Sequence, residues 1–373
     1  EFYLGSATVP VFTDYTSPFS WSWNTTGLSE GSYTIKAKAY SNTGNMAQNQ
    51  VQVLLLPANA CVWKGTSSAN WTSASNWHFD NIPTSTMDVI IPAYTPYSPT
   101  INFSNQQCRN LEIREGATLS FSTYGLTVNG YADIAGTLTM NSVGYLRVVG
   151  TLTFKPGATS NITSMSSEIR AEGNVTFQAG TSFQMSSGKF IMQGSSNRNL
   201  VSNSSSVILH RFTINKTSSS VIMSTPGSGT IICASTMTLQ AGTLISNETC
   251  NVILKSNLTG SGLLQMNSGT IWADGSNVTI SLSTSSYLNN VSVLGTGNLS
   301  FISNARIKGN IETLEGTLSA ENQILIVLGN WLSTNPSHFN YYDSHVIFSG
   351  TGDQYIGSVR FNSVGILDRK SVV

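Results

Sequence analysis

The chain has 373 residues, of which only 10% are charged, and its 18 Lys and Arg balance its 18 Asp and Glu. A neutral chain with so few charges has no electrostatic footprint for a nucleic acid or an anionic membrane, and no apolar run reaches the roughly 18 residues of a membrane span. Its 40% hydrophobic content argues against disorder, and Ser, Thr and Asn, together about a third of the residues, supply the solvation that charges supply in an ordinary domain.

Residues 1–56 alternate apolar and polar side chains, with turn-forming residues between the alternating runs. Residues 19–23, 33–40 and 51–54 are the predicted strands. The phrase from Trp23 to Tyr40 resembles the "W-N-T-T-x-L-x-x-G-x-Y-x-I-x-A-x-A-Y" signature of a bacterial Ig-like repeat. The resemblance covers the C-terminal strands of such a domain, places Tyr33 at its tyrosine corner, and implies that earlier strands precede Glu1.

Residues 57–107 form a predicted linker and N-terminal cap that is rich in Trp and Pro. Trp63, Trp71 and Trp77 fall within fifteen residues of one another, which indicates a compact aromatic core rather than a repeat. The pattern W-x-G…W…N-W…P-T…V-x-I-P…P-T-I resembles the module that precedes parallel β-helices in secreted proteins of Bacteroidetes-type bacteria.

Residues 108–367 repeat short apolar pairs separated by Gly or Asn, with no helical period. Examples of these pairs are Leu111/Ile113, Leu126/Val128, Leu138/Met140, Leu152/Phe154, Val175/Phe177, Val252/Leu254, Val291/Val293 and Val346/Phe348. Repeated short strands without crossover helices predict a solenoid in which each coil buries a narrow apolar stripe against its neighbours. We therefore expect an all-β chain whose main domain is a right-handed parallel β-helix of about a dozen coils.

A chain of β-sandwiches is the alternative all-β fold. Repeats of 19 and 14 residues, from Leu119 to Leu138 and from Leu138 to Leu152, are too short for it. Each sandwich would also need a buried Trp. The end of the repeat region, GNWLSTNPSHFNYYDSHVIFSGTGDQYIGSVRFNSVGIL, resembles another repeat of the same secreted proteins.

Both ends suggest a fragment of a longer polypeptide. The chain begins inside a predicted strand, without Met or a signal peptide. Residues 368–373, Asp-Arg-Lys-Ser-Val-Val, resemble a translated sequencing adapter, which predicts a non-native tail and a protein that continued beyond Leu367.

No catalytic constellation is evident. A glycosidase needs two carboxylates roughly 5 to 10 Å apart, whereas the acidic residues here are sparse, and Glu112, Glu115, Glu312 and Glu315 flank turn glycines. Arg306-Ile307-Lys308 matches a polygalacturonase motif, but the companion motifs are missing. His338 and His345 lack a standard metal-ligand spacing. We expect no catalytic residue, metal or cofactor.

Four cysteines, Cys61, Cys108, Cys233 and Cys250, allow three disulfide pairings. A Cys61–Cys108 bond would attach the cap to the first coil. Cys233 and Cys250 lie about one coil apart and are candidates for facing each other on successive coils. An oxidising, secreted location permits both bonds; the alternative is four buried free thiols.

These observations predict a non-catalytic structural or adhesive region of a secreted or cell-surface protein. Its expected partners are glycans or cell-surface proteins that contact the Ser, Thr and Asn faces, together with the rest of the same polypeptide at both ends. No nucleic-acid partner and no membrane insertion are expected. The alternative is a polysaccharide lyase or glycoside hydrolase, or its accessory stalk, with catalytic residues outside this fragment.

Overall fold

The computed structural model describes residues 1–373 except residues 30, 228, 342 and 368–373. The proposed non-native tail therefore lies outside the described residues. The chain divides into two compact units, residues 1–60 and residues 61–373, which are described separately.

The first unit is a three-stranded antiparallel sheet in the order β1-β2-β3. Its strands are β1 (Phe2–Leu4), β2 (Gly31–Tyr40) and β3 (Met46–Leu55). The tight turn between β2 and β3 contains Gly44 at φ 83°, a conformation that glycine adopts without steric cost. The Tyr33 hydroxyl donates to the Ser29 carbonyl at 2.6 Å, the local contact of a tyrosine corner.

The predicted strand at 19–23 is not a strand in the structure. Since β1 and β3 already flank β2, this segment contacts the sheet through side chains instead of a backbone ladder. The Trp21 ring lies 5.8 Å from the Phe2 ring, and the Trp23 ring lies 5.2 Å from the Tyr33 ring. The alternation of apolar and polar residues at 19–23 predicted a strand. The same alternation also occurs in an irregular segment whose aromatic side chains pack on a sheet, so it could not distinguish the two.

The second unit begins with a cap of short elements, and parallel pairing begins inside the segment predicted as cap. Val89 of β5 pairs with Leu111 of β8, and Thr100 of β6 pairs with Ser120. The cap elements and the first strands are β4 (Ala60–Val62), η1 (Ala74–Asn76), η2 (His78–Asp80), β5 (Asp88–Ile91), β6 (Thr100–Ile101), β7 (Gln106–Cys108) and β8 (Leu111–Ile113).

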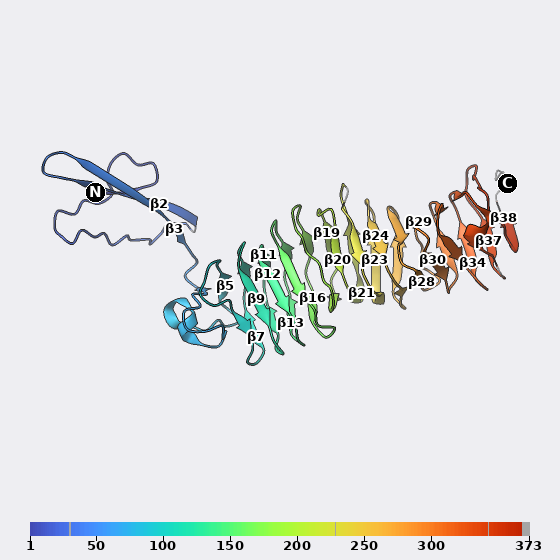
Figure 1. Ribbon diagram of the computed structural model, residues 1–373, viewed down its shortest axis with the longest axis horizontal. Coiled ribbons are helices and arrows are strands. Elements are labelled where there is room, and N and C mark those ends of the chain that lie inside the picture. Colours follow the sequence, from blue (N-terminus) through green and yellow to red (C-terminus); the bar gives the residue numbers. More distant parts are fainter. Residues whose placement is uncertain (30, 228, 342, 368–373) are drawn as a thin grey trace. The chain divides into compact units, whose positions relative to one another are not determined.

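The remainder is a parallel β-solenoid of about 13 turns, so the predicted parallel β-helix fold is confirmed. Figure 1 shows its coils side by side in chain order. Leu126 pairs with Leu146 on the next coil, and Val291 pairs with Ile311. The further strands of the largest sheet are β10 (Leu126–Val128), β11 (Ala132–Ile134), β13 (Tyr145–Val148), β14 (Leu152–Phe154), β16 (Glu168–Ala171), β17 (Val175–Phe177), β18 (Lys189–Gly194), β19 (Arg198–Ser202), β21 (Arg211–Ser224), β23 (Met237–Ser246), β25 (Leu258–Thr259), β26 (Leu263–Met266), β28 (Asn277–Ser281), β30 (Asn298–Phe301), β33 (Thr317–Ser319) and β36 (Phe339–Asn340).

Three smaller parallel sheets complete the coils. One extends from β6 through β9 (Thr118–Phe121) and β12 (Thr137–Met140) to β15 (Thr159–Ile162). The second contains β20 (Val207–Leu209), β22 (Ile231–Cys233), β24 (Asn251–Leu254), β27 (Thr270–Ala273), β29 (Asn290–Val293), β32 (Ile311–Thr313) and β35 (Trp331–Ser333). The third contains β31 (Ala305–Ile307), β34 (Ile324–Val327), β37 (His345–Phe348) and β38 (Ser363–Ile366), and η3 (Pro336–His338) lies between β35 and β36.

The core is a continuous column of alternate side chains from successive coils. Leu119 and Leu138, which pair between β9 and β12, are fully buried, whereas their neighbours in the strands are partly exposed. The Phe154 and Phe177 rings stack at 4.7 Å with an angle of 5° between their planes. Each buried Phe or Leu contributes roughly 1.5–3 kcal/mol relative to exposure, which a single coil cannot obtain without its neighbours.

Candidate functional site

All four cysteines are buried free thiols, so neither candidate disulfide is present in the structure. The Cys61 sulfur lies 3.4 Å from the Met87 sulfur. In the solenoid, the register places Leu254 opposite Cys233, and Cys250 precedes β24. Spacing by one coil was therefore an incorrect guide, because coil length varies and only the strand register decides which side chains face each other.

Burial makes these thiols poor nucleophiles. It raises the pKa of Cys233 and of Cys250 to about 12 and also raises the pKa values of Cys61 and Cys108. A thiol is reactive as the thiolate, so the cysteines belong to the core rather than to a reactive site.

The three cap tryptophans pack against one another and are inaccessible to a ligand. Trp63, Trp71 and Trp77 are fully buried. The Trp77 ring meets the other two edge-to-face, at 4.9 Å from Trp63 and 4.8 Å from Trp71. The Trp77 indole N–H donates to the Trp71 carbonyl at 2.8 Å. This is the arrangement of an aromatic core.

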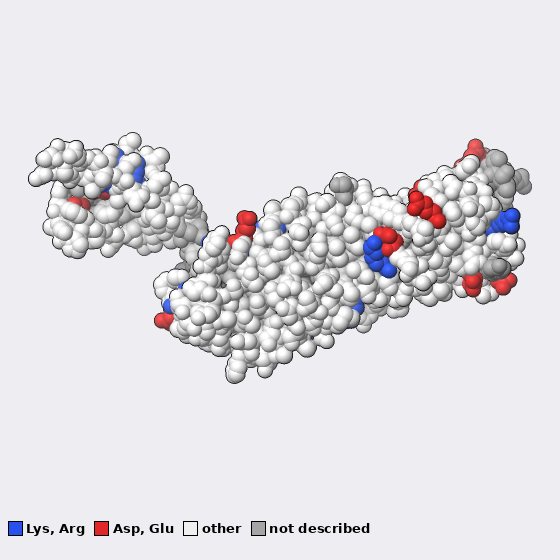
Figure 2. All heavy atoms as spheres, in the orientation of Figure 1, with Lys and Arg blue, Asp and Glu red and all other residues white. Residues whose placement is uncertain are grey.

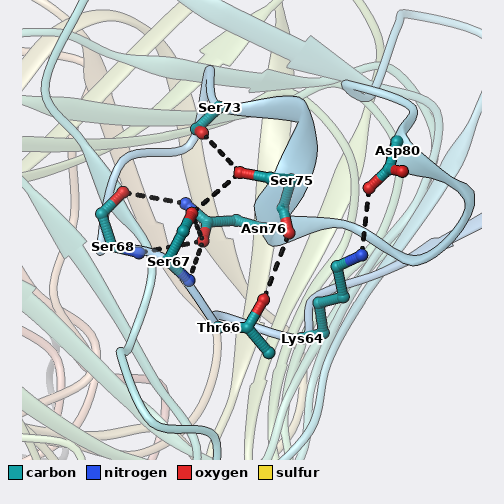
Figure 3. A network of polar contacts seen from close by, with 8 residues as sticks. All are labelled: Lys64, Thr66, Ser67, Ser68, Ser73, Ser75, Asn76 and Asp80. Atoms are coloured by element: carbon teal, nitrogen blue, oxygen red, sulfur yellow. Dashed lines mark hydrogen bonds and ion pairs between the residues drawn. The ribbon is translucent and has the colours of Figure 1, made fainter.

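A polar network around Asn76 closes the cap loop (Figure 3). The buried Asn76 side-chain oxygen accepts from the backbone N–H groups of Ser67 and Ser68, each at 3.0 Å, and from the Ser67 hydroxyl at 2.7 Å. Its amide nitrogen donates to the Ser68 hydroxyl and the Asn70 carbonyl. Both the oxygen and the nitrogen of the Asn76 amide are thus hydrogen-bonded within the cap, and these hydrogen bonds hold the loop in place.

Glu112, Glu312 and both histidine candidates have structural partners. Glu112 pairs with Arg114 at 2.9 Å, and Glu312 accepts from Ser292 at 3.1 Å. A His338 ring nitrogen lies 2.8 Å from the Thr313 carbonyl oxygen, whereas a His345 ring nitrogen contacts the Ser363 hydroxyl. Across the described residues, no group of three His, Cys, Asp or Glu could hold a metal ion.

A group of charged side chains from neighbouring coils lies on or directly beside the largest sheet, at residues that the sequence did not single out as a site. We call this surface the basic flank, and it comprises the half-buried side chains of Arg147, Glu168, Arg170, Glu172, Lys189, Arg198 and Arg211.

Five of the seven residues of the basic flank are in register across four coils, whereas Glu172 directly follows β16 and Arg198 begins β19, where it pairs with Val221. Arg147 of β13 pairs with Arg170 of β16, and Glu168 pairs with Lys189 of β18. Lys189 in turn pairs with Arg211 of β21. Because neighbouring strands lie about 4.8 Å apart, these charges form rows along the solenoid axis.

Two carboxylates neutralise part of the basic flank. Glu168 contacts Arg170 at 2.6 Å and Lys189 at 3.6 Å. Glu172 accepts from Arg147 at 2.8 Å and from Gln193 at 2.9 Å. Burial alone would raise the pKa of Glu172, but these hydrogen bonds hold that pKa below its usual value.

A count of charges in a sliding window would have found the basic flank. Residues 145–216 contain seven Lys and Arg but only two Asp and Glu, and the zero net charge of the whole chain concealed this imbalance. By contrast, Figure 2 shows a face of the solenoid on which charged side chains occur only at isolated points.

Comparison with known proteins matched two segments of the chain. Residues 1–37 match the bacterial Ig domain family, and residues 62–149 match a family described as a domain of unknown function (DUF8693). No curated protein and no solved structure matched the chain. Bacterial Ig domains are typical of extracellular proteins, and the described residues contain no helix long and apolar enough to cross a membrane. The chain thus joins a bacterial Ig-like domain to a parallel β-solenoid.

Proposed function

We propose that this chain is a non-catalytic structural and adhesive region of a protein secreted by, or displayed on, a bacterium of the Bacteroidetes type. The solenoid is a stalk that presents a binding surface to glycans or cell-surface proteins. The bacterial Ig-like domain supports an extracellular setting, since such domains are typical there.

The observation that carries this proposal is the uninterrupted parallel stack. Backbone pairing continues from β5 to β38 through four sheets, and the apolar residues of the coils form one core cluster. In such a solenoid each coil is held by its two neighbours. A stalk of this kind keeps outward side chains at a constant spacing along the axis, which favours multivalent contact with an extended partner.

The contacts of the acidic residues also favour a structural role. Glu112, Asp133, Glu168 and Glu172 each lie within ion-pair distance of a Lys or Arg. A general acid needs a carboxyl whose pKa is raised towards the working pH, whereas the hydrogen bonds of Glu172 lower its pKa.

The test is a glycan and protein binding array combined with a lyase and hydrolase screen on the purified chain. We expect saturable binding to at least one class of glycan or surface protein and no product release. Turnover of a polysaccharide would overturn the proposal in favour of the enzymatic alternative.

A further inference from the structure

The basic flank and the lysine next to it carry more positive charge than their carboxylates neutralise. Arg198 donates to the Glu172 backbone carbonyl at 3.0 Å, and Arg211 donates to the Gly188 carbonyl at 3.2 Å. Among the described residues, neither guanidinium lies within 4.0 Å of a carboxylate. Arg198 also donates to the Asn197 carbonyl, and Arg211 also donates to the Met165 carbonyl, so both guanidiniums are hydrogen-bonded to neutral groups and keep a positive charge that no carboxylate pairs with.

A buried cation adds to this imbalance. Lys216 is fully buried, and its ammonium donates to the Gln193 carbonyl at 2.6 Å. Burial lowers the pKa of Lys216, and the nearby Arg198 lowers it further, while Glu172 acts in the opposite direction. A charged lysine in this position adds positive potential at low dielectric to the surface beside it.

We propose that the basic flank binds an acidic polysaccharide, whose carboxylate or sulfate groups meet the Lys and Arg side chains of successive coils along the solenoid axis. This inference rests on the proposed function and names the chemical class of the partner. Arginine suits this ligand because its planar guanidinium donates two parallel hydrogen bonds to a carboxylate or a sulfate-like oxyanion. The polymer repeat allows several weak contacts to add along one chain.

The composition of the basic flank disfavours single-stranded nucleic acid. Such ligands depend on aromatic side chains on which bases stack. The aromatic ring in the same rows is Tyr145, and the Arg170 guanidinium already covers it at 4.7 Å from the ring centroid. The surface thus offers cations in rows but no open stacking platform there.

The experiment measures binding of the full chain to immobilised polygalacturonate, which carries carboxylates, and to dextran sulfate, with uncharged dextran as the reference. We expect binding to one or both acidic polymers that weakens when salt is raised from 50 to about 300 mM, because the Debye length shortens. The variant Lys189→Gln/Arg198→Gln/Arg211→Gln should bind about tenfold more weakly, given the modest energy of each exposed ion pair.

The matched control removes three positive charges elsewhere on the solenoid. Lys255→Gln/Arg306→Gln/Lys308→Gln has the same change in net charge and should bind like the unmodified chain. In addition, Glu168→Gln removes the carboxylate that holds Arg170 and Lys189 and should strengthen binding. This gain of affinity keeps the test decisive even if the triple variant of the flank unfolds, which circular dichroism would detect.

Equal loss in both triple variants, or unchanged affinity in Glu168→Gln, would sink the assignment of the site. Stronger binding to oligo-dT or to vesicles containing phosphatidylserine would assign the basic flank to a nucleic acid or a membrane instead. If the array identifies an uncharged glycan or a protein while both acidic polymers fail to bind, the proposed function stands and this inference falls. Cleavage of polygalacturonate would instead refute the non-catalytic function.

Discussion

At the scale of single residues, two buried polar side chains, Asn76 and Lys216, differ in how they are compensated. Asn76 has partners for both ends of its amide within the cap. Lys216 donates to one carbonyl and lies beside another cation, Arg198. The first arrangement stabilises the loop, whereas the second has an electrostatic cost, because a buried charge requires compensation.

Asn76→Asp should destabilise the cap by about 2 kcal/mol, because it replaces a buried donor by an oxygen facing the Asn70 carbonyl. The measurement is hydrogen exchange of residues 62–82, with urea unfolding for the free energy. Ser73→Ala, which removes an exposed hydroxyl contact, should leave both unchanged. Equal effects of the two substitutions would contradict the assignment of Asn76 as the organising residue.

Lys216 should give the stability an alkaline dependence. Its pKa is lower in the folded state than in the unfolded state, so above the folded-state pKa the unfolded chain binds more protons and stability rises with pH. The gain is complete once pH exceeds the ordinary lysine value of about 10.4. The four buried thiols, whose pKa values are raised, make the stability of both chains fall over the same alkaline range. The effect of Lys216 is therefore a difference: the stability of the unmodified chain relative to Lys216→Met should rise with pH, as urea unfolding of both chains at a series of pH values would reveal. An identical pH profile of stability in the two chains would disprove the role of Lys216.

The cysteines should react only after unfolding. Their burial and raised pKa values leave little thiolate at pH 8. We expect iodoacetamide to modify none of them rapidly in the native chain and all four in guanidinium without reductant, as counted by mass spectrometry. Two or no modified cysteines in the denatured chain would establish disulfides and contradict the structure.

At the scale of elements, the coils depend on contacts with adjacent coils. Asparagine side chains at the turns link each coil to the next. The Asn290 side-chain oxygen accepts from the backbone N–H of Asn310 at 2.8 Å. In the same way, the side-chain oxygen of Asn310 accepts from the Asn330 N–H at 2.9 Å and that of Asn330 accepts from the Tyr355 N–H at 2.8 Å. These hydrogen bonds satisfy the backbone at the turns, where strand pairing ends. The apolar side chains inside the coils likewise pack against the side chains of the adjacent coils.

Phe177→Ala should cost about 3–5 kcal/mol, because the fully buried ring stacks on Phe154 and leaves a cavity that rigid coils cannot fill. Hydrogen exchange should accelerate most in β14, β17 and β19 and least in β34 and β37, since solenoid coils couple to their neighbours. The outward Thr176→Ala is the control and should change stability by less than about 0.5 kcal/mol. Uniform acceleration along the whole solenoid would instead indicate one fully cooperative unit.

At the scale of the whole molecule, the chain consists of two compact units with their own hydrogen bonding. Among the residues that the structure describes, the antiparallel sheet of residues 1–60 and the parallel sheets of the solenoid share no strand. Neutrality likewise belongs to the whole chain and not to its parts, since residues 145–216 are strongly basic.

Residues 57–367 should therefore fold without the Ig-like unit. We expect the truncated chain to keep the β-type circular dichroism spectrum of the solenoid and its melting temperature within about 3 °C, because the described strands of the coils pair with one another within the residues that are kept. A large drop in melting temperature would mean that the first unit stabilises the second.

Several features were predictable because they depend on local patterns. Alternate apolar residues such as Leu126 and Val128 determine which side chains enter the core, and the short repeats indicated a solenoid. Cysteine pairing was not predictable from spacing, since Cys233 faces Leu254. The basic flank escaped detection because its members, such as Arg147 and Arg170, are 23 positions apart in sequence but adjacent in register.

The sequence by itself determined an all-β chain, an Ig-like beginning, an aromatic cap and a stack of short coils, because side-chain alternation and turn residues act over a few positions. Only the tertiary structure decided which residues of different coils face each other. Register depends on the length of each coil and on the bulges within it, such as those between β21 and β23. The stacking of the coils therefore decides that the four thiols are unpaired. It also brings Lys and Arg residues that are far apart in the sequence together in the basic flank.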